Sequence, residues 1–183
     1  MAKTAIFLAE GFEEIEALTV VDLLRRAQIE ITMVSVMGDL YVTGSHGITV
    51  KSDVQIGDYD FDSADMLILP GGMPGTSNLG ACTALTDQIL KFNHAGKPLA
   101  AICAAPTVYG KLGILDGKRA SCYPGCERDL KGALPQTDEV TICDNFITSR
   151  GMGTAIPFGL AIIEHFKGKA EADEMAKKIV FRQ

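Results

Sequence analysis

The central segment of the chain reads Lys97-Pro98-Leu99-Ala100-Ala101-Ile102-Cys103-Ala104-Ala105-Pro106. Its apolar residues 99–102 run without polar alternation, which is typical of a parallel strand covered on both faces. Pro106 is favoured in the first turn of a helix, where its missing N–H is not needed. The segment therefore predicts a strand that turns sharply into a helix with Cys103 at the corner, the geometry of a nucleophile elbow.

Cys103 at such a corner has two interpretations. The unpaired N–H groups of the following helix favour a thiolate, so we expect a lowered pKa and the most reactive of the five thiols. Small Ala104 and Ala105 would let a substrate approach the sulfur. The alternative is a buried free cysteine that packs as a small apolar residue.

Strand and helix patterns alternate on both sides of this segment. Strands are predicted at residues 4–9, 30–36, 65–69, 99–102, 118–123, 139–143 and 146–149, with a hairpin at 41–50. Helices are predicted at residues 13–27, 84–94, 106–112, 154–167 and 170–181. This order predicts one α/β domain over residues 1–183, with a mostly parallel central sheet between two helical layers. Sites in such sheets lie beyond the carboxyl ends of the strands.

Composition excludes several classes of function. The 183 residues carry a net charge of −6 without a basic run, which argues against nucleic-acid binding. The first strand-like run is too short for a signal peptide or a membrane span, so we expect a cytoplasmic protein without membrane contact. The five cysteines are an odd number and widely spread, which predicts thiols rather than disulfides.

Glu16 is the first candidate partner of Cys103. It shares a helical stripe with Val20 and Leu23, so its carboxyl group should point into an apolar interior. Burial raises the pKa of a carboxyl group, and a protonated Glu16 would donate a hydrogen bond to a thiolate. The alternative is a role in the helix dipole, which suffices to explain Glu13 and Glu14.

Two glycine motifs are candidates for backbone contacts. Gly71-Gly72 follows a predicted strand, and its N–H groups together with that of Ala104 would form an oxyanion hole, although a tight turn alone would also use glycine. Gly151 and Gly153 lack the third glycine of a dinucleotide loop, so we predict no nucleotide cofactor.

The sequence gives little support for a catalytic histidine or for a metal site. A cysteine peptidase needs a histidine base, and His46, in a hairpin turn, is the only one of three placed to reach a site. Cys122 and Cys126 lack a second pair of ligands, so we predict no metal ion.

Four motifs together resemble one family. They are Gly11-Phe12-Glu13-Glu14-Ile15-Glu16, Leu69-Pro70-Gly71-Gly72, the segment 100–106 around Cys103, and Thr148-Ser149-Arg150-Gly151-Met152-Gly153-Thr154. In this order they resemble the DJ-one-like branch of the ThiJ/PfpI family, which is related to class I glutamine amidotransferases. The resemblance implies a flavodoxin-like three-layer sandwich, a reactive Cys103 hydrogen-bonded to Glu16, and a backbone cradle from Gly72 and Ala104.

The resemblance also implies a homodimer, and the helix with Val20, Val21 and Leu24 is predicted to offer a second copy additional apolar surface. It further suggests a pocket mouth formed by Gly71, His46, Tyr123, Gly151 and Gly153. Many relatives carry His at the position of Tyr123, and Arg is common at that of His46.

The activity implied by the resemblance is cofactor-free conversion of methylglyoxal to lactate, or repair of glyoxal-modified groups, with protection against oxidative stress. Our hypothesis is accordingly a cysteine-dependent glyoxalase (a lyase) or deglycase (a hydrolase) acting on small carbonyl compounds. The alternative is a non-enzymatic redox sensor or chaperone that signals through oxidation of Cys103. A cysteine peptidase is more distant, because protease-like members carry His where this chain has Ala104.

Overall fold

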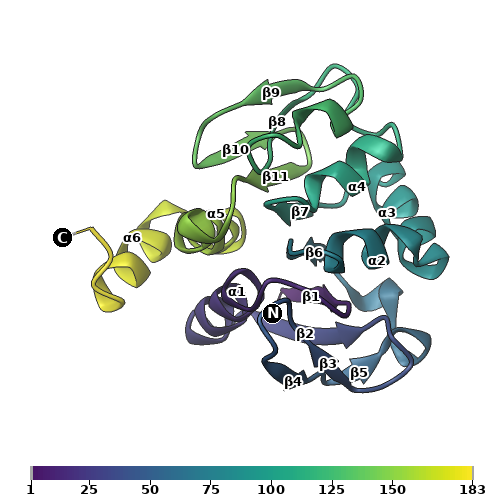
Figure 1. The fold of residues 1–183 in the computed structure, drawn as a ribbon. Coiled ribbons are helices and arrows are strands. Elements are labelled where there is room, and N and C mark those ends of the chain that lie inside the picture. Colours follow the sequence, from purple (N-terminus) through teal and green to yellow (C-terminus); the bar gives the residue numbers. More distant parts are fainter. Residues whose placement is uncertain (1, 183) are drawn as a thin grey trace.

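The computed structural model describes residues 2–182. Its central sheet has seven strands in the order β10-β11-β7-β6-β1-β2-β5, all parallel except the pair β10 and β11. Their bounds are β1 Lys3–Leu8, β2 Glu30–Ser35, β5 Val54–Gln55, β6 Met66–Leu69, β7 Leu99–Ile102, β10 Val140–Cys143 and β11 Phe146–Ser149. The mostly parallel sheet with helices on both faces is the predicted flavodoxin-like α/β class (Figure 1).

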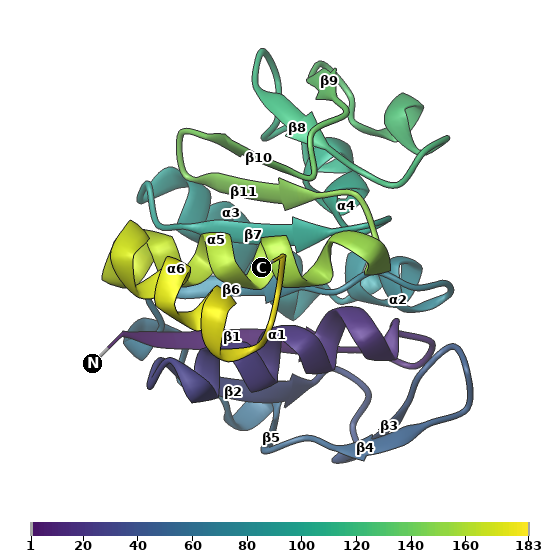
Figure 2. The ribbon, with the colours of Figure 1, turned by 90° about the vertical axis from the view of Figure 1, so that its left-hand side faces the viewer.

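Helices cover both faces of the sheet. Figure 1 shows α1, α5 and α6 on one side, with α2, α3 and α4 on the other. They are α1 Glu14–Arg26, α2 Gly75–Ala81, α3 Thr83–His94, α4 Pro106–Lys111, α5 Ala155–Lys167 and α6 Lys169–Lys178. Figure 2 shows α5 and α6 in front of the sheet, whose parallel strands point toward the right-hand edge.

Alternation along the buried strands divides the core into two layers. In β6, Ile68 packs in the cluster beneath α1 and α5, whereas Leu67 and Leu69 pack in the cluster beneath α3 and α4. This is the period of two expected of a strand whose faces are both covered. Val20, Val21 and Leu24 of α1 are also buried in the first cluster. These three side chains therefore offer no apolar surface to a second copy, although Ile15 of the same helix is 50% exposed.

Short elements account for the other differences from the predicted elements. The strand predicted at 118–123 is β8, Arg119–Ser121, and it pairs with β9, Leu134–Gln136, outside the central sheet. The predicted hairpin forms as β3, Tyr41–Thr43, and β4, Thr49–Lys51. The patterns missed α2, β5 and β9, because two to seven residues give too little periodicity to detect.

A buried hydrogen bond connects β7 to α4. The Tyr109 hydroxyl donates to the Ala100 carbonyl oxygen at 3.0 Å, and Tyr109 is fully buried. The bond thus fixes the helix after Cys103 to the strand before it.

Tyr109→Phe is expected to lower the free energy of unfolding by about 1 kcal/mol, because the Ala100 carbonyl loses a buried donor. Urea denaturation measures the change. Tyr41→Phe is the matched control, since the Tyr41 side chain is exposed on β3 and should leave stability unchanged. Equal effects of the two substitutions would contradict the role of the buried bond.

Candidate active site

Cys103 occupies the turn between β7 and α4 in a strained conformation. Its φ of 65° lies in the left-handed region, which is uncommon for residues other than glycine. Its N–H donates to the Ser149 carbonyl at 3.0 Å, and its carbonyl accepts the N–H of Tyr123 at 2.7 Å. The surrounding backbone therefore fixes this strained residue on both sides, as expected of a nucleophile elbow.

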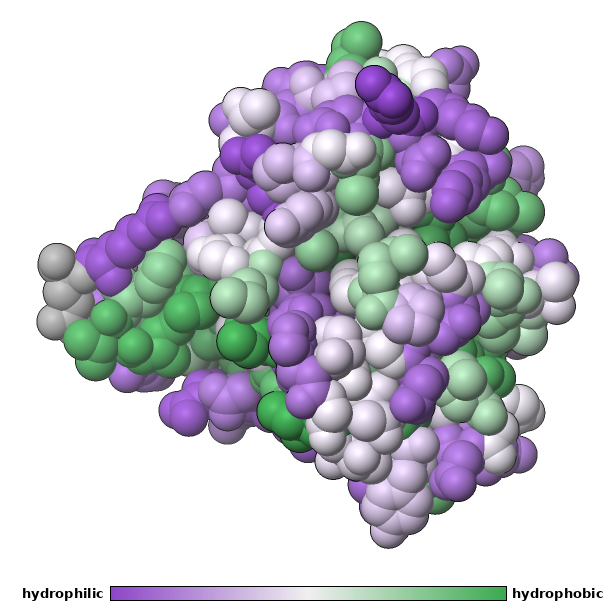
Figure 3. Space-filling view, in the orientation of Figure 1, coloured by the Kyte–Doolittle hydropathy of each residue, from purple (hydrophilic) through white to green (hydrophobic). Residues whose placement is uncertain are grey.

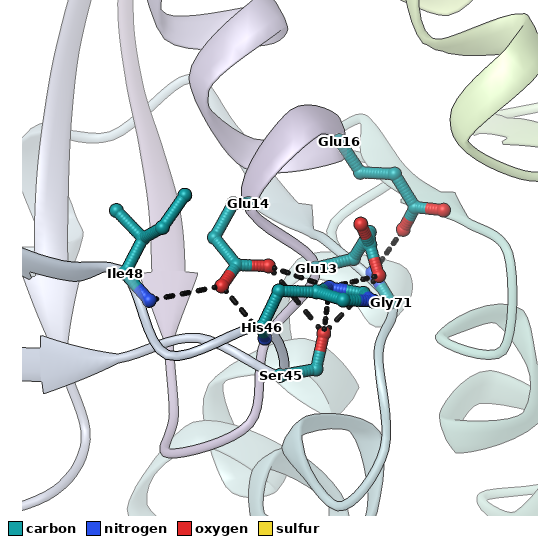
Figure 4. Close-up of polar contacts among 7 residues, drawn as sticks. All are labelled: Glu13, Glu14, Glu16, Ser45, His46, Ile48 and Gly71. Carbon is teal, nitrogen blue, oxygen red and sulfur yellow. Dashed lines mark hydrogen bonds and ion pairs between the residues drawn. The ribbon is translucent and has the colours of Figure 1, made fainter.

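The Glu16 side chain approaches Cys103 from the first turn of α1. Glu16 is 1% exposed, and its Oε2 accepts the N–H of Gly71 at 2.8 Å (Figure 4). Its carboxyl group also forms a hydrogen bond with the Cys103 thiol. The buried Glu16 and the partly exposed Cys103 thus form one polar pair, with Gly71 beside it.

Glycine at position 71 makes this pairing sterically possible. A Cβ atom there would lie 2.6 Å from Cys103 Cβ and 2.7 Å from Glu16 Oε2, far below contact distance. Gly72 follows with a φ of 90°, and its Cβ would lie 2.4 Å from the Glu13 nitrogen. The Gly72 and Ala104 N–H groups both hydrogen-bond to Cys103 and lower its pKa.

The two side chains shift each other's ionisation. Burial raises the pKa of Glu16 to about 7, an effect that the negative charge of Glu13 increases and that hydrogen bonds to Cys103 and Gly71 oppose. Burial and the charge of Glu16 raise the pKa of the Cys103 thiol to about 12. The expected lowering of the Cys103 pKa is wrong. The six-residue helix α4 begins only at Pro106, and its N–H groups do not offset burial beside a carboxylate.

The pair can nevertheless produce a thiolate internally. When the thiol proton passes to the Glu16 carboxylate, the charge that opposes the thiolate disappears. The resulting carboxylic acid then donates a hydrogen bond to the sulfur. A thiolate at Cys103 would therefore depend on a proton shared by the pair rather than on a thiol that ionises to solvent.

Three residues predicted for the pocket mouth line one hollow. Tyr123, Gly151 and Gly153 surround a space of about 290 Å³. Arg150 and Met152, which were not predicted as site residues, lie in the same loop and also line the hollow. The two glycines on either side of Met152 are the sequence feature that could have indicated both residues.

His46 lies elsewhere. Its Nδ1 is 3.1 Å from Glu14 Oε2 and 3.6 Å from Glu13 Oε2. Within residues 2–182, no hydrogen bond joins any of the three histidines to Cys103. The structure thus gathers Glu16, Gly71, Gly72 and Ala104 around the sulfur and leaves His46 in a separate cluster.

The fold and this pair define an α/β protein with a cysteine elbow opposed by a buried glutamic acid. The chain belongs to the DJ-1/PfpI family, whose model matches residues 2–165. None of the helices described is both long and apolar enough to span a bilayer.

Three similar proteins illustrate this membership. The chain is 32% identical to Glutathione-independent glyoxalase DJR-1.2 of Caenorhabditis elegans, across 97% of this chain and 96% of that protein. Identity to Protein DJ-1 homolog B of Arabidopsis thaliana is 35% over 98% of this chain, which spans only 42% of that relative. The structure of oxidized Toxoplasma gondii DJ-1 superposes with a TM-score of 0.96 at 33% identity, covering both chains completely.

Alkylation of Cys103 by iodoacetamide is expected to accelerate as the pH rises through about 7, because Glu16 then loses its proton and can accept that of the thiol. Mass spectrometry of the Cys103 peptide gives the rate at each pH. In Glu16→Gln this step should vanish, since glutamine cannot accept the proton. A wild-type rate that is flat around neutral pH, or the same step in the variant, would refute the shared proton.

Proposed function

We propose that this protein is a cysteine-dependent, cofactor-free glyoxalase that acts on methylglyoxal-type 2-oxoaldehydes or, as a deglycase, on their adducts. The observation that carries the proposal is a buried Glu16, with a pKa of about 7, hydrogen-bonded to Cys103. A group that ionises near neutral pH is suited to repeated proton transfer. The name of the Caenorhabditis elegans relative, a glutathione-independent glyoxalase, supports the same chemistry.

The first step is addition to the aldehyde. Cys103 sulfur attacks the aldehyde carbon while its proton passes to the Glu16 carboxylate. The developing oxyanion accepts hydrogen bonds from the Gly72 and Ala104 N–H groups, the donors that already contact the sulfur. Glu16 then returns the proton to the oxyanion, which leaves a neutral hemithioacetal and an ionised carboxylate.

The second step moves hydrogen within the substrate. The Glu16 carboxylate removes the proton from the former aldehyde carbon, giving an enediolate. The hydroxyl proton then passes from the former aldehyde oxygen to the neighbouring oxygen, and Glu16 returns its proton to the neighbouring carbon. The former aldehyde carbon becomes a thioester carbonyl, and the neighbouring ketone becomes an alcohol. Water cleaves the thioester to lactate and restores the thiol. One carbon is oxidised while its neighbour is reduced, so the reaction needs no external electron carrier.

Cys103→Ser is expected to abolish conversion of methylglyoxal to lactate, and Glu16→Gln to lower kcat by about 10²–10⁴-fold, the typical loss of an acid–base group. The glutamine keeps the size of the side chain but cannot shuttle a proton. Enzymatic detection of lactate gives the rate, and intact-mass spectrometry is expected to detect hemithioacetal on the Glu16→Gln protein.

The controls are Cys82→Ser, at another partly exposed thiol, and Glu164→Gln, at an exposed glutamate of α5. Both should retain wild-type turnover. If Glu16→Gln instead turns over within about threefold of wild type, far from the acid–base range, Glu16 is a structural acid.

That outcome would favour the second candidate, a redox sensor or chaperone that protects against oxidative stress. One observation supports it. Cys103 is partly exposed, and its sulfur faces a carboxyl group and two N–H donors, which would also hold the oxygens of an oxidised cysteine. A peptidase has less support, since His94 and His165 are exposed and His46 contacts Glu14 instead of Cys103.

We also propose that the protein works as a homodimer. Leu18, Ile156 and Ile179 line a surface hollow of about 330 Å³ between α1, α5 and the chain end after α6. Figure 3 shows apolar surface in this region, at the left of the view. Val180 nearby is 71% exposed. Apolar surface of this kind is typical of contacts between subunits.

The chain has a mass of 19.5 kDa, and multi-angle light scattering at micromolar concentration is therefore expected to give twice that mass. Leu18→Glu should shift the protein toward monomer, because it replaces an apolar side chain of the hollow with a second acidic group beside Asp22. Leu90→Glu on exposed α3 is the matched control and should remain dimeric. A wild-type mass equal to one chain would remove the proposal.

A further inference from the structure

A second cluster of ionisable side chains lies beside the Cys103 pair. Glu13 and Glu14 stand at the start of α1, and His46 projects from the turn between β3 and β4 (Figure 4). One ligand atom from each of the three lies within 4.8 Å of the others. The mechanism proposed above assigns no role to Glu14 or His46.

The Glu14 carboxylate is fixed by backbone donors. Its Oε1 accepts the N–H of His46 at 2.8 Å and that of Ile48 at 3.3 Å. Its Oε2 then faces the His46 ring, with Nδ1 at 3.1 Å. Gly44 leaves room for this arrangement, because a Cβ there would lie 2.3 Å from the carboxyl carbon. Donors that orient a carboxylate in this way are typical of the outer shell of metal sites.

We propose that Glu13, Glu14 and His46 bind a divalent first-row cation of the zinc type. Zinc ligands about 2.0–2.2 Å from the metal in a tetrahedron lie roughly 3.3–3.5 Å apart. His46 Nδ1 lies 3.1 Å from one carboxylate oxygen and 3.6 Å from the other, so two of the three spacings are close to those of a tetrahedral site before any ion enters. The combination of one imidazole and two carboxylates suits zinc and its neighbours.

Charge and access fit the same ion. Two carboxylates and a neutral imidazole balance a dication, and the positive end of α1 favours the carboxylates in their ionised form. The Glu14 side chain is 4% exposed whereas that of His46 is 69% exposed, so the cluster opens to water on the histidine side. The Ser45 hydroxyl oxygen lies 3.0 Å from His46 Nδ1, 3.2 Å from Glu13 Oε2 and 3.4 Å from Glu14 Oε2, so this hydroxyl, or a water molecule that displaces it, can complete the tetrahedron. Magnesium and calcium prefer six or more oxygen ligands, which three side chains do not supply.

The same contacts without a metal would form a proton-mediated pair. A protonated His46 ring donates to the Glu14 carboxylate at the same distance. A metal ion and the proton compete for Nδ1, so cation binding must release a proton where the ring is charged. The two interpretations differ in whether Zn²⁺ binds at this histidine.

The site is close to the Cys103 pair but separate from it. The N–H of Glu13 donates to the Gly71 carbonyl at 2.9 Å, and the N–H of Gly71 donates to Glu16. Binding of Zn²⁺ by Cys103 itself must therefore be excluded in any measurement. Replacing Cys103 with serine removes that ligand and leaves Glu13, Glu14 and His46 in place.

Isothermal titration of the full-length Cys103→Ser protein with Zn²⁺ tests the proposal. We expect one Zn²⁺ site whose affinity falls by at least about tenfold in His46→Gln. That is the smaller end of the loss typical when even an outer-shell partner of a metal ligand is replaced. His94→Gln and His165→Gln are the matched controls, because both histidines are exposed and distant in sequence from the cluster. They should leave this site unchanged, and excess Mg²⁺ should not compete.

A second measurement uses the wild-type histidines. In the NMR spectrum of protein with labelled imidazole rings, Zn²⁺ should shift the His46 signals and leave those of His94 and His165 in place. Zn²⁺ affinity that His46→Gln does not alter, or an unmoved His46 signal at saturating Zn²⁺, would overturn the proposal. These readouts do not involve methylglyoxal turnover, so they stand or fall independently of the proposed glyoxalase activity.

Discussion

The absence of a side chain at Gly71 allows Glu16 and Cys103 to meet. A Cβ atom there would lie within 2.7 Å of both partners, so any larger residue would separate the carboxyl group from the thiol. Gly71 also donates its N–H to Glu16 Oε2 at 2.8 Å, which fixes the carboxyl group beside Cys103. The end of β6, the first turn of α1 and the elbow after β7 thus converge on a single glycine.

Burying Glu16 lowers stability at neutral pH. A pKa of about 7 in place of 4.5 means that the folded state holds the proton more tightly than the unfolded chain does. The stabilisation that comes from this tighter proton binding is complete below pH 4.5, the pKa in the unfolded chain. It is lost as the pH rises through about 7, the pKa in the folded state. At about 1.4 kcal/mol for each pKa unit, the loss amounts to about 3 kcal/mol. The buried bond from Tyr109 and the backbone bonds around Cys103 keep the elbow in place despite it.

The sequence predicted the residues of the candidate site better than their energetics. Cys103, Glu16 and Gly71 each follow or face a strand end, and strand ends of a parallel sheet share one edge, so their convergence was predictable. The sign of the Cys103 pKa shift was not predictable from the sequence, because it depends on how deeply the sulfur is buried beside a charge. The position of His46 was also beyond local patterns. It depends on how the β3–β4 hairpin packs on α1, 32 residues away in the chain.

The first turn of α1 places two carboxyl groups in opposite electrostatic environments. Residues that are two apart in the sequence of a helix lie about 200° apart around its axis, so the Glu14 and Glu16 side chains point in nearly opposite directions. Burial acts to raise the pKa of Glu14, but hydrogen bonds from the backbone and from His46 outweigh it and lower that pKa. Glu16 has one backbone donor and a thiol, and burial there prevails. One helical turn therefore supplies a permanent carboxylate to the hairpin side and a carboxyl group that can gain and lose a proton to Cys103. The hydrogen-bond donors that each side chain meets, rather than the residue type, determine which role it takes.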